Sequence, residues 1–111
     1  MGVKSPPYRQ GDVCLVRLDP TEGSETRKTR PCLVISPDEM NRALATLLVA
    51  PMTTGGKSWP TRIPCTFQGK SGHVVLDQIR TIDRDRVIQR LGRVSSQTLR
   101  SVLDRLLEMF S

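Results

Sequence analysis

Short apolar runs alternate with turn-forming residues along most of the chain, and this pattern predicts a mainly β domain. Strands are predicted over residues 11–18, 31–36, 45–52, 61–68 and 73–82. Residues 87–94 are more typical of a strand than of a helix. Pro31 suits the start of a strand because proline donates no ladder hydrogen bond, and Pro64 places its strand at a sheet edge. A turn at 69–72 predicts a hairpin between the strands on either side.

Two segments have the features of helices. Residues 37–44 predict one or two turns, with Pro37 at the entrance and acidic residues directly after it. Near the end of the chain, apolar residues recur at helical spacing, with Ser95 or Ser96 as N-cap. This stripe consists of Leu99, Val102, Leu103, Leu106, Leu107 and Phe110. Many short strands and one amphipathic helix indicate a small, strongly bent antiparallel barrel closed by that helix.

The length of 111 residues predicts one compact domain, residues 11–111, preceded by a short arm, residues 1–10. No apolar run has the roughly 18 to 20 residues that a membrane span needs, and the arm has no apolar core of a signal peptide. We therefore expect a cytoplasmic protein. Cys14, Cys32 and Cys65 are odd in number and widely spaced, so we expect buried thiols rather than a disulfide framework, a metal site or a redox site.

The net charge of +6 is concentrated in one half of the chain. Residues 52–100 contain nine Lys or Arg and three Asp, a surplus equal to that of the whole chain. Such a surplus predicts a polyanionic partner, either a nucleic acid or an acidic protein segment. A solvated basic surface without a partner is the alternative.

Several kinds of enzyme are disfavoured by what the sequence lacks. There is one histidine, His73, at the head of a predicted strand, where a structural or surface role is expected. No carboxylate cluster has metal-ligand spacing, and the sequence TTGGK lacks the pattern of a phosphate-binding loop. We therefore expect neither a metal nor a cofactor.

The loop between the first two predicted strands places an acid, Glu25, close to the cations Arg27, Lys28 and Arg30. A carboxylate beside a guanidinium suits cleavage of RNA, because the guanidinium holds the phosphate with two donors while a base takes the proton of the 2′-hydroxyl. RNA supplies its own nucleophile, so no metal is required. The alternative is a solvated loop whose charges form ordinary surface pairs.

The blocks LDPT, GSE, TRP, VAPMT and LDQIRTID occur in this order, followed by RLGRVS and a terminal helix. Over residues 9–110 the sequence thereby resembles the MazF/PemK family of toxin ribonucleases. The resemblance implies an SH3-like barrel of the CcdB/PemK type with a C-terminal helix, a homodimer and a cognate antitoxin. It also implies metal-independent cleavage of single-stranded RNA at short motifs, which leaves a 2′,3′-cyclic phosphate or 3′-phosphate and a 5′-hydroxyl.

Site residues follow from the same resemblance. Arg30 matches the catalytic arginine of the family, Thr53 its catalytic threonine, and Glu25 an acid found beside them in some members. RNA contacts are expected from the rim of the first loop, from its two further cations, from the loop after the third strand and from the LDQ block. These residues are Pro20, Gly23, Ser24, Arg27, Lys28, Thr54, Lys57, Trp59, Asp77 and Gln78.

Some assignments stay open at this stage. Some family members carry an arginine directly before the DQ pair as proton donor, whereas this chain has Val75 and Leu76 there. We expect Arg30 to donate, which leaves the base unassigned because arginine does not readily lose its proton. Trp59 is expected either to stack on a base or an antitoxin, or to fold back on the barrel. The alternatives to a ribonuclease are a CcdB-like gyrase poison and an RNA-binding barrel without activity.

Overall fold

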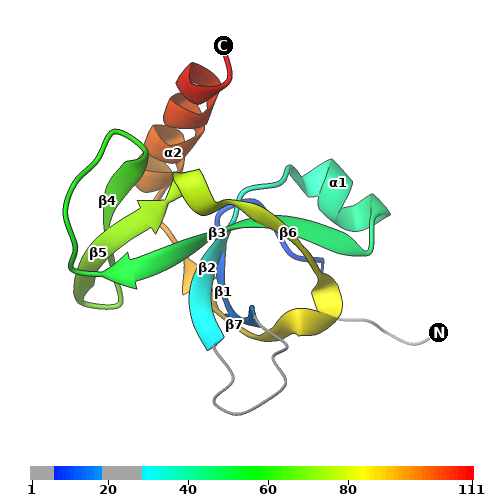
Figure 1. Ribbon diagram of the computed structural model, residues 1–111. Helices are drawn as coiled ribbons and strands as arrows, with labels where there is room; N and C mark the ends of the chain where they lie inside the picture. Colours follow the sequence, from blue (N-terminus) through cyan, green and yellow to red (C-terminus); the bar gives the residue numbers. More distant parts are fainter. Residues whose placement is uncertain (1–6, 19–28) are drawn as a thin grey trace.

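The computed structural model describes residues 7–18 and 29–111. It confirms a mainly β fold with a C-terminal helix (Figure 1). The strands are β1 (Asp12–Arg17), β2 (Thr29–Val34), β3 (Thr46–Thr54), β4 (Arg62–Phe67), β5 (Lys70–Val75), β6 (Arg80–Asp83) and β7 (Val87–Arg93). The helices are α1 (Asp38–Ala43) and α2 (Ser96–Met109), with short 3-10 helices η1 (Leu76–Gln78) and η2 (Arg84–Arg86). No helix in these two ranges is long and apolar enough to cross a membrane.

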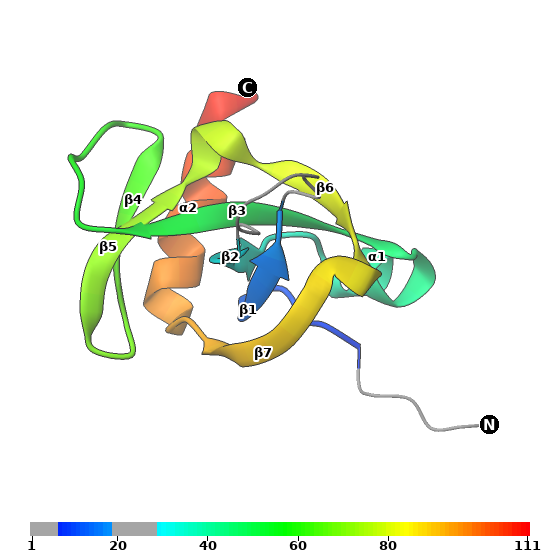
Figure 2. The same cartoon turned by 60° about the horizontal axis from the view of Figure 1, so that its bottom comes forward.

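The strands form one antiparallel sheet in the order β4-β5-β3-β2-β1-β7, and β6 pairs with β3. In Figure 1, β1, β2, β3, β6 and β7 surround the barrel axis, while the β4–β5 hairpin lies to one side. Figure 2 shows α2 running between the hairpin and the barrel. The edge position of β4, with its Pro64, is as predicted, and β2 lies at the centre of the sheet.

Residues of β1, β2 and β3 alternate between two apolar cores, one on each face of the sheet. Val13, Leu33 and Ala50 belong to the core that α2 covers with Val102. Cys14 and Val49 belong to the core inside the barrel. Burial on both faces explains why these strands are almost wholly apolar. Most side chains of these strands are therefore used for packing within one chain.

Exposed apolar surface lies on α2. Ser95 caps this helix, since its Oγ accepts a hydrogen bond from the Thr98 backbone N–H at 3.1 Å. Val102 is fully buried, but Leu107 and Phe110 are 71% and 73% exposed. Only the first part of the predicted stripe is therefore covered within one chain.

The predicted strand over residues 73–82 is wrong in one respect, because η1 interrupts it. Val74 of β5 lies opposite Met52, and Arg80 of β6 lies opposite Val49, so five residues (75–79) face two residues of β3 (50–51). The surplus forms a bulge that turns Leu76 into the core and leaves the next two residues exposed. β5 and β6 thus follow the same edge of β3 on either side of this bulge.

The predicted turn at 69–72 is also displaced. Phe67 pairs with Lys70, which leaves Gln68 and Gly69 as a two-residue hairpin turn. Their φ values of 51° and 80° are the pair of positive angles that a type I′ turn requires. Lys70, Ser71 and Gly72 therefore belong to the strand β5, not to the turn.

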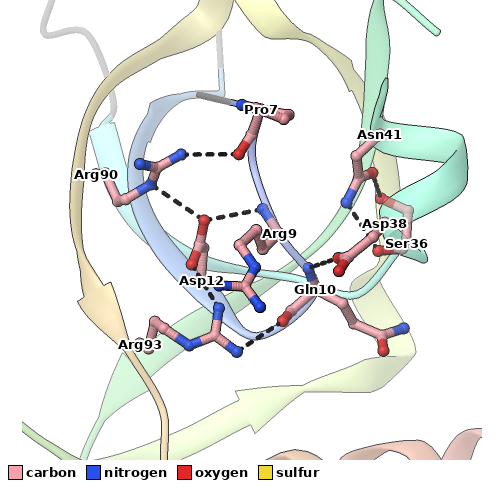
Figure 3. A network of polar contacts seen from close by, with 9 residues as sticks. All are labelled: Pro7, Arg9, Gln10, Asp12, Ser36, Asp38, Asn41, Arg90 and Arg93. Atoms are coloured by element: carbon pink, nitrogen blue, oxygen red, sulfur yellow. Dashed lines mark hydrogen bonds and ion pairs between the residues drawn. The ribbon is translucent and has the colours of Figure 1, made fainter. Parts of the chain in front are cut away.

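A polar cluster around Asp12 fastens residues 7–10 to the barrel (Figure 3). The Asp12 side chain is 3% exposed and pairs with Arg90 Nε at 3.1 Å and Arg93 Nη1 at 2.9 Å. It also accepts a hydrogen bond from the Arg9 backbone N–H, and the Arg90 guanidinium lies 5.0 Å from the centre of the Tyr8 ring. These contacts join the start of β1 to β7 and make the cluster structural.

Candidate functional site

Arg30 and Thr53 lie where the β2–β3 ladder ends. That ladder pairs Val34 with Val49 and ends with Cys32 opposite Pro51. Continuing its register by two residues sets Arg30 opposite Thr53. Beyond this point β2 pairs with β1 and the end of β3 pairs with β5. The two residues therefore come together where the sheet divides.

Both residues line one cleft with a volume of about 500 Å³. Its walls come from the start of β2, the end of β3, the β4–β5 hairpin and β7. The lining residues are Arg30, Pro31, Met52, Thr53, Thr54, Cys65, Phe67, Gln68, Lys70, Gly72, His73 and Leu91. Arg30 and Thr53, which the resemblance assigns to catalysis, are both among these residues, and their catalytic roles stay predictions.

The charged side chains of this cleft are cationic. Arg30 enters from β2 and Lys70 from β5. Within residues 7–18 and 29–111, no Asp or Glu lines it. Such a cleft attracts an anion, and the planar guanidinium of Arg30 matches the two oxygens of a phosphate. The Thr53 hydroxyl adds a neutral donor beside it.

Gly72 allows the strand that carries His73 to approach Thr53 closely. A Cβ built on Gly72 would overlap the Thr53 carbonyl oxygen. In the next register position His73 lies directly opposite Thr53, so the two side chains share one side of the sheet. The structural role expected for His73 did not include this place beside the cleft.

The β4–β5 hairpin brings three residues with polar or charged side chains into the cleft that the sequence prediction missed: Gln68, Lys70 and His73. The signal that could have found them is the two-residue turn at Gln68 and Gly69. With that turn, His73 falls opposite Pro64 and beside Thr53. The displaced turn in the prediction concealed this register.

Of the other predicted RNA-binding residues that the structure describes, one lines the cleft and four do not. Thr54 lines it. Lys57 and Trp59 are exposed on the segment between β3 and β4, and Trp59 is 57% exposed rather than folded against the barrel. Asp77 and Gln78 lie on η1 and do not line the cleft.

Asp77 has partners of its own. It accepts hydrogen bonds from Thr61 Oγ1 at 2.9 Å and from Arg62 Nε and Nη2, each at 3.3 Å. The bonds from Arg62 and then Thr61 lower the pKa of its carboxyl, which therefore stays ionised. Ionised Asp77 is an acceptor only, which suits recognition of an N–H group on a base edge.

Six predicted site residues lie outside the described residues: Pro20, Gly23, Ser24, Glu25, Arg27 and Lys28. Their roles stay predictions. Arg30 is the second residue of β2, so only Thr29 separates it from this segment.

The cysteines are buried and free, in agreement with the sequence prediction. Burial raises the pKa of Cys14 to about 11 and that of Cys32 to about 12, so both are thiols at neutral pH. Burial also raises the pKa of Cys65 at the cleft floor. Within the part of the chain that the structure covers, no three His, Cys, Asp or Glu residues are grouped as metal ligands.

Comparison with known proteins identifies relatives across almost the whole domain. Residues 9–110 match the family described as the PemK-like, MazF-like toxin of type II toxin-antitoxin systems. The endoribonuclease PemK of Escherichia coli is 39% identical over 103 residues, which are 87% of this chain and 77% of that protein. The endoribonuclease toxin MazF of Escherichia coli K12 is 33% identical over 93 residues, 83% of this chain and 84% of that protein.

Solved structures agree with this assignment. A MazE–MazF structure from Deinococcus radiodurans has a TM-score of 0.82 at 26% identity, and the match covers 96% of this chain and 97% of that one. MazF alone from the same organism has a TM-score of 0.78, also at 26% identity, with coverage of 96% and 98%. The chain therefore belongs to the PemK-like, MazF-like family of toxins of type II toxin-antitoxin systems.

Proposed function

We propose that this protein is the toxin of a type II toxin-antitoxin system and a sequence-specific endoribonuclease that cleaves single-stranded mRNA without a metal. Family membership supports the activity, because the relatives are named endoribonucleases. The observation that supports a location for the active site is that Arg30 and Thr53 line the same cleft. A gyrase poison and an inactive RNA-binding barrel receive no such support.

In the proposed reaction the scissile phosphate occupies the cleft. Arg30 donates two hydrogen bonds to its oxygens, Thr53 donates a third, and Lys70 adds positive charge. The 2′-oxygen attacks phosphorus as it loses its proton, and the 5′-oxygen of the next nucleotide leaves with a proton. The products are a 2′,3′-cyclic phosphate and a 5′-hydroxyl. Donors fixed before reaction stabilise the charge that grows on the phosphate.

Glu25 completes the proposed catalytic set, and either Glu25 or another group near the 2′-hydroxyl acts as base. In this proposal the RNA is contacted by Pro20, Gly23 and Ser24 at the rim of the first loop and by the cations Arg27 and Lys28 of the same loop. Thr54, Lys57 and Trp59 contact it from the segment after β3. Since Asp77 and Gln78 lie outside the cleft, they contact a neighbouring nucleotide and take part in base choice.

The proposed partners are single-stranded RNA, an antitoxin and a second copy of this chain, and the proposed location is the cytoplasm. An antitoxin segment with acidic and apolar residues suits the cationic cleft. The related MazF of Deinococcus radiodurans has structures with MazE. Exposed Leu107 and Phe110 on α2 support a homodimer.

The test is cleavage of a long RNA in EDTA, followed by mapping of the cut positions and analysis of both new ends. We expect cuts at one short motif, with 5′-hydroxyl and cyclic phosphate or 3′-phosphate ends. Strict dependence on added metal, or 5′-phosphate ends, would contradict the proposed reaction. Intact RNA with DNA gyrase inhibited would favour the gyrase poison instead.

A further inference from the structure

The segment that follows β3 makes a glycine-rich turn beside the cleft. Gly55 and Gly56 have φ values of +68° and +89°, which residues with side chains rarely adopt. The Gly55 N–H donates to the Ser71 carbonyl at 3.0 Å, and residues 54–60 are exposed. Packing alone therefore does little to hold this turn, and its position depends on polar contacts.

His73 makes contacts at both ends of the turn. Its Nδ1 lies 2.9 Å from the Gly55 carbonyl oxygen, and its Nε2 lies 3.4 Å from Ser58 Oγ. A carbonyl oxygen accepts only, so Nδ1 carries the hydrogen in the first contact. In the neutral ring Nε2 is then an acceptor, and the Ser58 hydroxyl can donate to it. One imidazole can thus bridge both ends of the turn.

The same ring lies beside the proposed catalytic threonine. His73 and Thr53 are register partners on β5 and β3. A Cβ built on Gly56 would lie 3.8 Å from His73 Nδ1 and 4.0 Å from Thr53 Oγ1. The middle of the turn is therefore close to both side chains, and the exposed residues Lys57 and Trp59 lie one and three positions further along the chain.

We propose that His73 is a positioning residue that ties the Gly55–Ser58 turn to the cleft wall beside Thr53. By doing so it orders Lys57 and Trp59 for contact with RNA. The effect on RNA rests on the proposed function, whereas the effect on the turn does not. Loss of the ring leaves the turn with the Gly55–Ser71 hydrogen bond and, beyond it, the Trp59–Arg62 bridge.

The first test needs no RNA. Trypsin cleavage of the Lys57–Ser58 bond is followed by mass spectrometry in wild type, His73→Ala, His73→Asn and Ser58→Ala, with thermal melts to verify folding. His73→Ala should be cut about three- to tenfold faster, as expected when hydrogen bonds with a net value of about 1 kcal/mol are lost. His73→Asn keeps a donor near the Nδ1 position but loses the contact with Ser58, so it should fall between wild type and His73→Ala. Ser58→Ala, which removes the same contact, should be cut at a rate close to that of His73→Asn.

Equal cleavage of the Lys57–Ser58 bond in His73→Ala and wild type would overturn the proposal. So would cleavage of Ser58→Ala at the wild-type rate together with cleavage of His73→Asn as fast as that of His73→Ala, since the turn would then not depend on the two contacts in the stated way.

The second test is the rate of RNA cleavage between pH 5.5 and 8.5. His73→Ala should raise KM more than it lowers kcat, and His73→Asn should restore KM in part and keep the wild-type pH profile. If His73→Asn instead loses kcat while its turn still resists trypsin, the ring transfers protons and the positioning role is wrong. If the wild type itself cleaves no RNA, the proposed function fails and the trypsin result still decides the role of His73 in the turn.

Discussion

Two regions of this barrel gather cationic side chains but surround them differently. At the start of β1, Arg90 and Arg93 both bind the buried carboxylate of Asp12. At the end of β3, Arg30 and Lys70 line a cleft that has no carboxylate among its described lining residues. The first region uses its guanidinium donors to hold residues 7–10 and β7 in place. The second presents its donors to a cavity.

The contrast teaches that positive charge alone does not locate a phosphate site. The sequence puts the whole charge surplus in residues 52–100, and Arg90 and Arg93 belong to that surplus. Both have structural partners, whereas Arg30 lies outside the basic span and lines the cleft. The following variants test this difference in order of expected effect.

Arg30→Ala should lower the single-turnover rate of RNA cleavage in EDTA by about 100- to 1,000-fold. Loss of one preorganised donor to developing charge typically has that effect. The melting temperature should stay near that of wild type, because the β1–β2 ladder uses the Arg30 backbone and not its side chain. A rate equal to that of wild type would place the reaction elsewhere.

Asp12→Ala should lower the free energy of unfolding by about 2 to 3 kcal/mol in urea, because it removes a buried acceptor shared by several donors. Solvent reaches Arg90 and Arg93, which limits the loss. Per folded molecule the variant should cleave RNA like wild type. A stable variant without activity would show that this region, and not the cleft, serves the reaction.

Gly72→Ala should cost about 1 to 3 kcal/mol of stability and also lower cleavage, because its Cβ overlaps the Thr53 carbonyl and displaces β3. Gly69→Ala is the matched control. Gly69 has φ +80°, but a Cβ added there would meet no atom within 4 Å, so this variant should lose stability and keep its rate per folded molecule. Equal rate losses in both variants would show that cleavage does not depend on the position of Thr53.

Lys70→Ala should weaken binding of RNA a few-fold and reduce the slope of log K against log salt by about 1, as expected for one lost phosphate contact. Fluorescence titration at several salt concentrations measures this slope. Arg100→Ala on α2, outside the cleft, should leave the slope unchanged. A larger effect from Arg100 than from Lys70 would place the RNA on the helix.

Asp77→Asn should have the smallest effect, visible in the pH dependence of stability. The folded pKa of Asp77 lies below its ordinary value of 3.8, so the ionised carboxylate stabilises the fold above that pH. This contribution disappears as the pH falls through the folded pKa. The small advantage of wild type over Asp77→Asn in melting temperature should therefore vanish between pH 4 and pH 2, and a constant difference would contradict the pairing with Arg62.

Local signals allowed most of the fold to be predicted. Ile63 and Cys65 alternate with exposed Pro64, and Ser95 caps the last helix as the sequence indicates. The interruption at 76–78 was missed because it depends on pairing with the distant strand β3. The turn at Gln68 and Gly69 was missed because it depends on the register between β4 and β5, which alternation within one strand does not encode. For the same reason the site prediction, which came from resemblance, named Arg30 and Thr53 but not Lys70 or His73.

The most direct test of the central claim is a chemical-shift titration of ¹⁵N-labelled protein with an RNA that contains the mapped motif. A 2′-deoxy sugar at the cleavage position keeps this RNA intact. We predict that the largest shifts occur at the amides of Thr53, Thr54, Gly72 and His73, while those of Asp12 and Arg90 remain in place. Shifts centred on Asp12, Arg90 and Arg93, with the Thr53 region unchanged, would contradict the account.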